Sequence, residues 1–360
     1  MTQVETGQTS GQLGESSSYG LHRVLEPAGV LPQQATLLNA APEPWPDEII
    51  VDVERLNLDA ASFRQLREAH PEPAKLRAAV LEIIRGSGKM HNPVTGSGGM
   101  LIGKVRARGP EAELNLHVGD RIATLVSLTC TPLRVTDELS GWDGSTEQIP
   151  CSGTAVLFRR SVAAKLPTDL ADQLALSVFD VCGAPALTDR VVRQYGTGAR
   201  VCVLGGAGKS GSLSLAAARD AGADAVLALV PTEAEAAALR QAGLADAVAI
   251  ADARDPVATS EAITATLGRS ADITVVCVDV PGCEHGAILA TADGGTVVFF
   301  SMATSFTAAA LGAEALAADV RMLVGNGYAP GHADFALDLV RRHDGVRTLF
   351  ERREGHTHRS

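Results

Sequence analysis

The stretch Val201-Cys-Val-Leu-Gly-Gly-Ala-Gly-Lys-Ser-Gly211 decides the fold of the second half of this chain. Its first four residues are apolar and predict a buried strand, whereas residues 213–223 are apolar and Ala-rich and predict a helix. Three glycines between them have G-x-G-x-x-G spacing: Gly206, Gly208 and Gly211. In such a strand–turn–helix the first glycine permits a tight turn, the second lets a pyrophosphate approach the backbone, and the third lets helix and strand pack closely. The stretch therefore predicts a dinucleotide-binding site.

Two other motifs compete with this interpretation. A P-loop would end in Gly-Lys-Ser, as residues 208–210 do, but it needs a glycine at position 203, where this chain has Val203. A glycine-rich turn in another kind of parallel α/β unit remains the alternative. The expected cofactor-binding residues lie in the turn and at the ends of later strands: Gly205, Gly206, Gly208, Lys209, Ser210, Gly211, Pro231, Thr232, Val278, Asp279 and Met302.

The composition limits the class of protein. A chain of 360 residues, 46% of them hydrophobic, is long enough for two domains with separate cores. The formal net charge of −11 argues against nucleic acid as a partner and favours neutral or cationic small ligands. No apolar run reaches the length of a membrane span, so we expect no membrane partner.

The N-terminus and the cysteines indicate the compartment. Residues 1–18 are polar and lack the apolar core of a secretion signal, so we expect a disordered tail and a cytoplasmic protein. The six cysteines are scattered and form no C-x-x-C pair, which argues against a disulfide framework.

The pattern of predicted strands and helices changes near residue 166. Before it, short strands such as 49–53 and 100–106 are separated by turns, which predicts a small β-barrel or a partly open β domain. From 166 to 324, Ala- and Leu-rich helical segments alternate with short apolar strands, which predicts an α/β fold with a doubly wound parallel sheet. Residues 325–360 contain one predicted helix, 333–342, and a polar, basic end.

This order of domains resembles the medium-chain dehydrogenase/reductase superfamily, and Val118-Gly-Asp-Arg-Ile-Ala123 is similar to that superfamily's V/P-G-D-x-V turn. Three longer motifs resemble, more narrowly, the family of L-erythro-3,5-diaminohexanoate dehydrogenases. They are Gly88-Lys-Met-His-Asn-Pro-Val-Thr-Gly-Ser-Gly-Gly99, Phe179-Asp-Val-Cys-Gly-Ala-Pro185 and Gly325-Asn-Gly-Tyr-Ala-Pro-Gly-His332.

The resemblance implies a GroES-like β-barrel catalytic domain, residues 19–165 and 325–360, and a Rossmann domain, residues 166–324. It implies NAD(P)-dependent oxidative deamination of L-erythro-3,5-diaminohexanoate to 5-amino-3-oxohexanoate in lysine fermentation, or the same reaction on a related β-amino acid. It also implies a homodimer, because the superfamily commonly pairs Rossmann domains across sheet edges. The alternative enzyme is a zinc-free reductase of a quinone, enone or ketone, and the alternative outside catalysis is a nucleotide-binding structural protein.

The resemblance also raises the question of zinc. Zinc-dependent members of the superfamily use a Cys, a His and a second Cys, and His91 and Cys182 fall at the second and third of these positions. The first falls in residues 56–61, which contain no Cys and resemble the zinc-free branch. Asp59 could replace it, although a carboxylate with a single thiolate is a less usual zinc set. We therefore expect no bound metal.

Hydride abstraction from an amine requires its neutral form, so a base must first remove a proton and later activate water. His91 is the first candidate because histidine titrates near neutrality, with a structural loop histidine as the alternative. Lys89 could pair with the substrate carboxylate or lower the pKa of a nearby base. Asp180 interrupts an apolar run, so it could bind a second substrate ammonium, orient His91 or cap a helix. The expected catalytic residues are His91, Asp180, Lys89 and Asn92, and the expected substrate-binding residues are Asp59, Glu147 and Tyr328.

The choice between NAD and NADP depends on the second strand of the predicted sheet. A site for NAD usually has an acid about 20 residues beyond the glycines, where it holds the ribose hydroxyls. Here the strand at 225–230 is followed by Pro231 and Thr232, with no acid at its end and no Arg or Lys close by. We expect NADP or NAD to be used, with a weak preference for NADP.

Overall fold

The computed structural model describes residues 16–125, 127–301, 303–325 and 327–357, without the side chains of 354–357. The chain forms two compact units, which divide between Leu166 and Pro167. Within the described residues, no helix is both long and apolar enough to cross a membrane.

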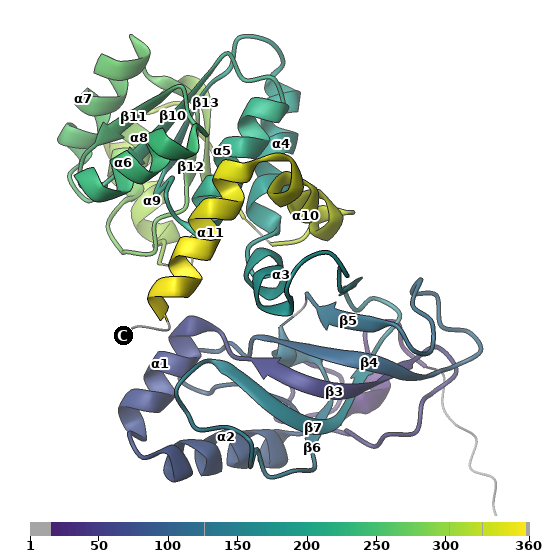
Figure 1. The fold of residues 1–360 in the computed structure, drawn as a ribbon. Coiled ribbons are helices and arrows are strands. Elements are labelled where there is room, and N and C mark those ends of the chain that lie inside the picture. Colours follow the sequence, from purple (N-terminus) through teal and green to yellow (C-terminus); the bar gives the residue numbers. More distant parts are fainter. Residues whose placement is uncertain (1–15, 126, 302, 326, 358–360) are drawn as a thin grey trace, which may run out of the picture. The chain divides into compact units, whose positions relative to one another are not determined.

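Unit 1 is built on an antiparallel sheet of six strands in the order β6-β7-β3-β4-β5-β8 (Figure 1). Its strands are β3 (Ile49–Asn57), β4 (Met100–Arg108), β5 (Arg121–Thr124), β6 (Leu133–Val135), β7 (Gln148–Leu157) and β8 (Ala163–Lys165). A smaller pair, β1 (Val24–Glu26) and β2 (Leu37–Leu38), and two short 3-10 helices, Leu21–Arg23 and Leu128–Cys130, complete its extended segments. The order of strands is that of the partly open β domain expected from the sequence.

Two helices complete the core of unit 1. Helix α2 (Pro73–Ser87) buries Leu76, Val80 and Ile84 at helical spacing, and it ends at Gly88, whose φ of +67° suits glycine. Helix α1 (Ala60–Ala69) was not expected from the sequence. It has few apolar residues, and it begins where the Asp59 side chain accepts a hydrogen bond from the Ser62 amide.

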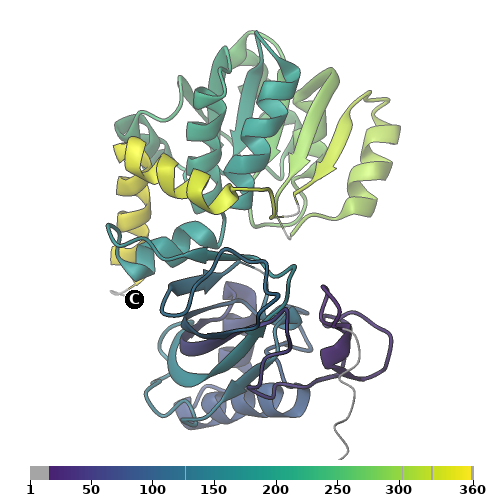
Figure 2. The same ribbon diagram turned by 90° about the vertical axis from the view of Figure 1, so that its right-hand side faces the viewer.

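Unit 2 is a parallel sheet in the order β11-β10-β9-β12-β13-β14, with helices on both faces (Figure 2). The strands are β9 (Arg200–Leu204), β10 (Ala225–Val230), β11 (Ala247–Ile250), β12 (Ala271–Val276), β13 (Thr291–Phe299) and β14 (Arg321–Val324). The helices are α3 (Asp172–Phe179), α4 (Gly183–Tyr195), α5 (Lys209–Asp220), α6 (Glu233–Ala242), α7 (Pro256–Leu267), α8 (Glu284–Leu289), α9 (Phe306–Ala315), α10 (His332–Arg342) and α11 (Asp344–Thr357). The order reverses beside β9, which confirms the doubly wound fold and places the switch point at the glycine turn.

The prediction that residues 325–360 return to the first domain is wrong. Helix α10 packs on α3, α4 and α5, and α11 packs on α5 and α6, all in unit 2. Helix α10 buries a strongly amphipathic face, and Arg341 and Arg342 form ion pairs with Asp169 and Asp220. The sequence did not predict the second helix of this segment, α11, because it has only a short apolar stripe.

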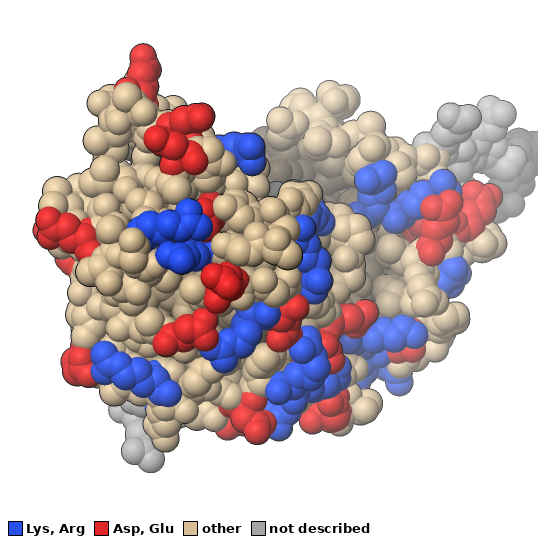
Figure 3. Space-filling model, turned by 90° about the horizontal axis from the view of Figure 1, so that it is seen from above, with Lys and Arg blue, Asp and Glu red and all other residues tan. Residues whose placement is uncertain are grey.

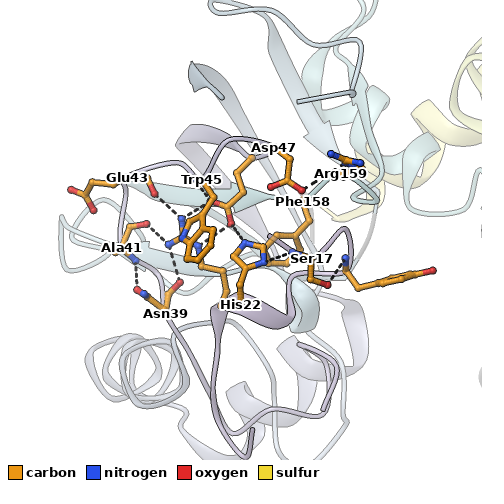
Figure 4. Close-up of polar contacts among 12 residues, drawn as sticks. Ser17, His22, Asn39, Ala41, Glu43, Trp45, Asp47, Phe158 and Arg159 are labelled. Atoms are coloured by element: carbon orange, nitrogen blue, oxygen red, sulfur yellow. Dashed lines mark hydrogen bonds and ion pairs between the residues drawn. The ribbon is translucent and has the colours of Figure 1, made fainter. Parts of the chain in front are cut away.

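A buried ionic cluster fixes the N-terminal segment of unit 1 to the start of β3 (Figure 4). Glu48 is fully buried and accepts hydrogen bonds from His22, Arg23 and the Trp45 amide. The remaining guanidinium N–H groups of Arg23 donate to carbonyls of residues 39, 41 and 43. Burial alone would raise the pKa of Glu48, but these hydrogen bonds outweigh it and lower the pKa.

We predict that Glu48→Gln lowers the free energy of unfolding at pH 7 by about 3 kcal/mol or more, because it leaves a buried cation without its anion. The folded-state pKa of Glu48 is lowered, so its stabilisation is present above the unfolded-state pKa and is lost as the pH falls through the folded-state value. Urea unfolding should therefore show a smaller loss on acidification in the variant than in the wild type. Glu54→Gln, which removes a more exposed pair with Arg121, is the control and should cost below about 1 kcal/mol. Equal losses in both variants would contradict this account.

Candidate functional site

The glycine turn after β9 has room for a pyrophosphate. Gly205 has a φ of +79°, so the tight turn needs a glycine one position before the motif. A Cβ on Gly206 would lie 2.8 Å from that of Ala228, and one on Gly211 would lie 2.2 Å from the Gly205 carbonyl oxygen. A Cβ on Gly208 would meet only one atom within 4 Å. Gly206 and Gly211 therefore bring the helix onto the strand, while Gly208 leaves the backbone open.

The amino end of helix α5 makes this turn electropositive. The helix begins at Lys209, and no side chain caps it at Gly208, so its first amides remain for a ligand. The Lys209 ammonium forms an ion pair with Asp180, with 3.1 Å between Nζ and Oδ2. Arg353, on helix α11, donates to the carbonyl of Ala207 in the turn. The turn thus fits a dinucleotide pyrophosphate.

Arg353 is a residue that the sequence analysis missed. It lies near the end of the chain in a polar segment, about 150 residues from the turn it contacts, and no motif marks it. Only the packing of α11 on α5 brings its guanidinium to the glycine turn.

The other predicted cofactor residues lie after the strands of the same sheet. Pro231 and Thr232 follow β10, and the Thr232 hydroxyl accepts a hydrogen bond from the Glu235 amide as the cap of α6. Val278 is half-buried and Asp279 is exposed, both beyond the end of β12. Met302 lies outside the described residues. Binding of the cofactor by these residues stays a prediction.

In unit 1, the polar loop at residues 88–99 is built around a buried lysine. Lys89 is only 1% exposed, and its ammonium donates to the carbonyls of Pro32 and Gln33. Burial lowers the pKa of Lys89 to about 8. The ammonium of Lys89 is enclosed by the protein, which favours the alternative that it lowers the pKa of a nearby base, and its direct action on the substrate stays a prediction.

His91 is better placed to react. Its side chain is half-buried, and its imidazole forms a hydrogen bond with the Gln33 carbonyl, which also accepts from Lys89. Burial and the charge of Lys89 lower the pKa of His91, against the effect of that hydrogen bond. A neutral imidazole that donates one N–H to a carbonyl keeps its other nitrogen as an acceptor. His91 thus has the protonation state that a general base needs near neutral pH.

Asn92 links the loop to helix α1. It is fully buried, its Nδ2 donates to Gln65 of α1, and its Oδ1 accepts from the Val94 amide. A second bond, between Ser62 and Thr95, joins the same helix to the loop. These hydrogen bonds give Asn92 a structural role in fixing the loop against α1, and a catalytic role for it stays a prediction.

Two predicted substrate ligands lie near this helix. Asp59 uses Oδ1 to cap α1, whereas its Oδ2 is a buried atom that has no hydrogen-bond partner among the described residues. The carbonyl of Glu147 accepts a hydrogen bond from the amide of Leu58, the neighbour of Asp59, and its own side chain is half-exposed. A buried carboxylate oxygen without a partner is costly unless a cation reaches it. The structure therefore brings Asp59 and Glu147 to one part of unit 1.

Asp180 and Cys182 lie between helices α3 and α4 of unit 2. Asp180 follows α3 and does not cap α4, because α4 begins at Gly183 and no side chain caps it. Cys182 is 2% exposed, and burial raises the pKa of its thiol to about 12. In the part of the chain that the structure describes, no three His, Cys, Asp or Glu side chains lie close enough to hold a metal. The absence of zinc stays a prediction.

Tyr328 belongs to unit 2, in the segment before α10. It is 51% exposed, and its ring meets that of His332 edge to face at 5.2 Å between centroids. His332 is buried at the first position of α10, where Gly331 is the N-cap. Substrate binding by Tyr328 stays a prediction.

These features define a class of protein, the dinucleotide-binding proteins: an antiparallel β domain is followed by a doubly wound parallel sheet with a glycine turn at its switch point. The crystal structure of CurK enoyl reductase superposes with a TM-score of 0.55 at 16% identity, over 84% of this chain and 81% of that one. At this identity the likeness concerns the fold alone.

Sequence comparison identifies the family within this class. Residues 22–167 match the L-erythro-3,5-diaminohexanoate dehydrogenase N-terminal domain. The chain is 46% identical over 340 residues to the L-erythro-3,5-diaminohexanoate dehydrogenase of Acetoanaerobium sticklandii, covering 93% of this chain and 98% of that enzyme. It is 42% identical over 338 residues to the enzyme of the same name from Fusobacterium nucleatum, covering 92% and 97%. The chain belongs to the L-erythro-3,5-diaminohexanoate dehydrogenase family, and it is an oxidoreductase.

We predict that Gly208→Ala weakens ligand binding, whereas Gly211→Ala lowers the stability of the protein. Gly208→Ala should leave the melting temperature nearly unchanged and weaken the binding of ADP-ribose, because its methyl group projects where the pyrophosphate approaches. Gly211→Ala should itself destabilise the protein by about 1–3 kcal/mol, because its Cβ would overlap the Gly205 carbonyl. Thermal unfolding and calorimetric titration with ADP-ribose measure both effects. Wild-type affinity in Gly208→Ala would contradict the assignment of the turn.

Proposed function

We propose that the chain catalyses the NAD(P)-dependent oxidative deamination of L-erythro-3,5-diaminohexanoate to 5-amino-3-oxohexanoate, as the names of its relatives indicate. The observation that supports this most is the sequence identity of 46% and 42%, over almost the whole chain, to two enzymes of that name. Carboxylates suit a substrate with two ammonium groups, whereas an enone or ketone would offer them no cation.

The proposed chemistry follows from the protonation states. His91, held neutral, takes a proton from the C3 ammonium of the substrate and so leaves a neutral amine. A nicotinamide dinucleotide held at the glycine turn, residues 205–211, would supply the acceptor for the hydride that leaves C3. His91 then passes this proton to solvent and can act as a base a second time, taking a proton from the water that adds to the iminium. Return of a proton to the nitrogen of the resulting carbinolamine and loss of its O–H proton release ammonia and give the 3-oxo product. Asp59, Glu147 and Asp180 are proposed to hold the substrate's ammonium groups, and Tyr328 is proposed to contact the substrate.

The choice of dinucleotide follows from the end of β10. Among the described residues, Thr232 at this position is neutral, and the next acid, Glu233, forms an ion pair with Arg240. The residue directly after β10 and Pro231 thus carries no charge that would repel a ribose 2′-phosphate, and Arg240, the nearest arginine on α6, is paired with Glu233. We propose that both dinucleotides are used, with a weak preference for NADP.

We further propose a homodimer formed by pairing of β14 edges. This strand ends the sheet, so one side of its backbone has no partner strand in the described chain. Leu323 and Val324 on it and Leu311 on α9 are exposed, at 37%, 58% and 61%. Such an edge is a template for a second copy.

Basic and acidic side chains are interspersed over the face in Figure 3, which supports the expectation that nucleic acid is not a partner. Cytoplasmic location and a place in lysine degradation stay predictions.

The function is tested by the formation of reduced cofactor at 340 nm. We expect turnover with L-erythro-3,5-diaminohexanoate, with kcat/KM for NADP and NAD within about tenfold of each other because no charge discriminates them. A chelator should leave the rate unchanged. A panel of other β- and δ-amino acids is the comparison, and reduction of an enone or a ketone without any amine oxidation would support the alternative reductase and contradict the proposal.

The role of His91 is tested by its pH dependence. The pKa of His91 is lowered, so kcat/KM should remain high down to a pH below the ordinary value of 6.5 and fall only as the base is protonated. His91→Asn should lower kcat at least about 100-fold. Lys89→Met should move the acidic limb to higher pH, because His91 loses the neighbouring charge that disfavours its protonation. If the acidic limb of the kcat/KM profile lies at the same pH in Lys89→Met as in the wild type, Lys89 does not lower the pKa of His91.

The role of Asp59 is tested with two substitutions. Asparagine caps a helix about as well as aspartate, so Asp59→Asn should keep stability within about 0.5 kcal/mol while raising KM for the diamino acid. Asp59→Ala should raise KM and also destabilise the protein by about 1 kcal/mol, because the cap is lost. An unchanged KM in Asp59→Asn would assign the residue to capping alone.

A further inference from the structure

The ion pair between Lys209 and Asp180 occupies the position that a dinucleotide needs. Lys209 is the first residue of α5, directly after Gly208, so its ammonium lies at the amino end of the helix that faces the pyrophosphate. Asp180 follows α3 and accepts from Lys209 at 3.1 Å. The two side chains are 37% and 39% exposed, so both can be reached by a ligand.

We propose that Lys209 exchanges Asp180 for the pyrophosphate of the cofactor, so that dinucleotide binding releases the Asp180 carboxylate to hold an ammonium group of the substrate. The substrate part of this inference rests on the proposed function. Through this exchange the Lys209–Asp180 ion pair would make cofactor affinity and substrate affinity depend on each other.

Charge explains why the exchange favours the pyrophosphate. Asp180 offers one negative charge in a solvent-exposed pair, which is weakly held. A pyrophosphate offers two negative charges, and its other oxygens accept from the uncapped amides at the start of α5. Lysine is a flexible point charge, so its ammonium can turn from one anion to the other without moving the backbone.

The same charges explain why Asp180 does not remain at the turn. Once the pyrophosphate is bound, a carboxylate beside Lys209 faces a like charge, and repulsion favours its departure. A cation of the substrate then becomes its best partner. Arg353, whose guanidinium donates to Ala207 in the turn, keeps a positive charge there throughout the exchange. By thermodynamic linkage, a cofactor that frees Asp180 must tighten substrate binding, and the substrate must tighten cofactor binding equally.

The exchange is tested by calorimetric titration of the full chain with ADP-ribose, which carries the pyrophosphate and lacks the nicotinamide. Lys209→Met should weaken ADP-ribose binding about tenfold, because a charge-assisted contact is lost. Asp180→Asn should tighten it about two- to fivefold, because Lys209 no longer has a competing anion. That gain should shrink in the double variant, where there is no ammonium to release.

Two controls make the result specific. Asp189→Asn removes another surface carboxylate of unit 2, paired with Arg193 on α4, and should leave ADP-ribose affinity unchanged. Adenosine, which has no pyrophosphate, should bind all variants alike. If Asp180→Asn leaves ADP-ribose affinity unchanged or weakens it, or if Asp189→Asn tightens it as much, the exchange is overturned.

A second titration separates the exchange from the proposed substrate. L-erythro-3,5-diaminohexanoate is titrated into the wild type with and without saturating ADP-ribose. The proposal expects several-fold tighter binding in its presence, and this coupling should disappear in Lys209→Met and in Asp180→Asn. If the ADP-ribose results hold and the diamino acid does not bind under either condition, the proposed substrate fails while the exchange between anions stands. If the diamino acid binds without coupling, Asp180 is not its ligand and the substrate part is overturned.

Discussion

The close approach of helix α5 to strand β9 is the constraint on which unit 2 depends. A Cβ at position 211 would lie 2.2 Å from the carbonyl oxygen of Gly205, so only glycine allows this packing. That approach points the first amides of α5 into the turn, and it places Lys209 beside Asp180 and the turn near Arg353. The cofactor site and the proposed exchange between anions both depend on the absence of a Cβ atom at Gly206 and Gly211.

Unit 1 depends on a different feature, buried charged side chains that are held by hydrogen bonds. Glu48 with Arg23 fixes the N-terminal segment to β3, and the Lys89 ammonium fixes residues 32 and 33 to the loop that carries His91. Each buried cation would destabilise the fold if its partners were removed, so each specifies one arrangement of its segment. In the second case the same charge lowers the pKa of a histidine that we propose as the base. Structure and reactivity are thus coupled through Lys89.

Local patterns were good guides where one property dominates a segment. Apolar runs predicted β9 to β13 of the parallel sheet but not its edge strand β14, and the glycine spacing predicted the turn. Helix α1 was missed because its start depends on a cap and its apolar stripe is short, and α11 was missed for the second reason. Lys89 and Asn92 were assigned to chemistry because polarity in a glycine-rich loop is typical of a site, but such a loop also needs internal partners for its own polar groups.

The sequence by itself determined the two-domain order, the doubly wound sheet, the position of the dinucleotide turn and the membership of the family, because these follow from periodicity, glycine positions and long contiguous motifs. The tertiary structure decided which polar side chains form hydrogen bonds or ion pairs within each unit and which keep atoms without such partners. It enclosed Lys89, left one oxygen of Asp59 without a partner in the described part of the chain, paired Asp180 with Lys209 and placed the C-terminal helices in unit 2. The physical reason is that burial and hydrogen-bond partners are set by residues distant in the chain, which no local pattern contains.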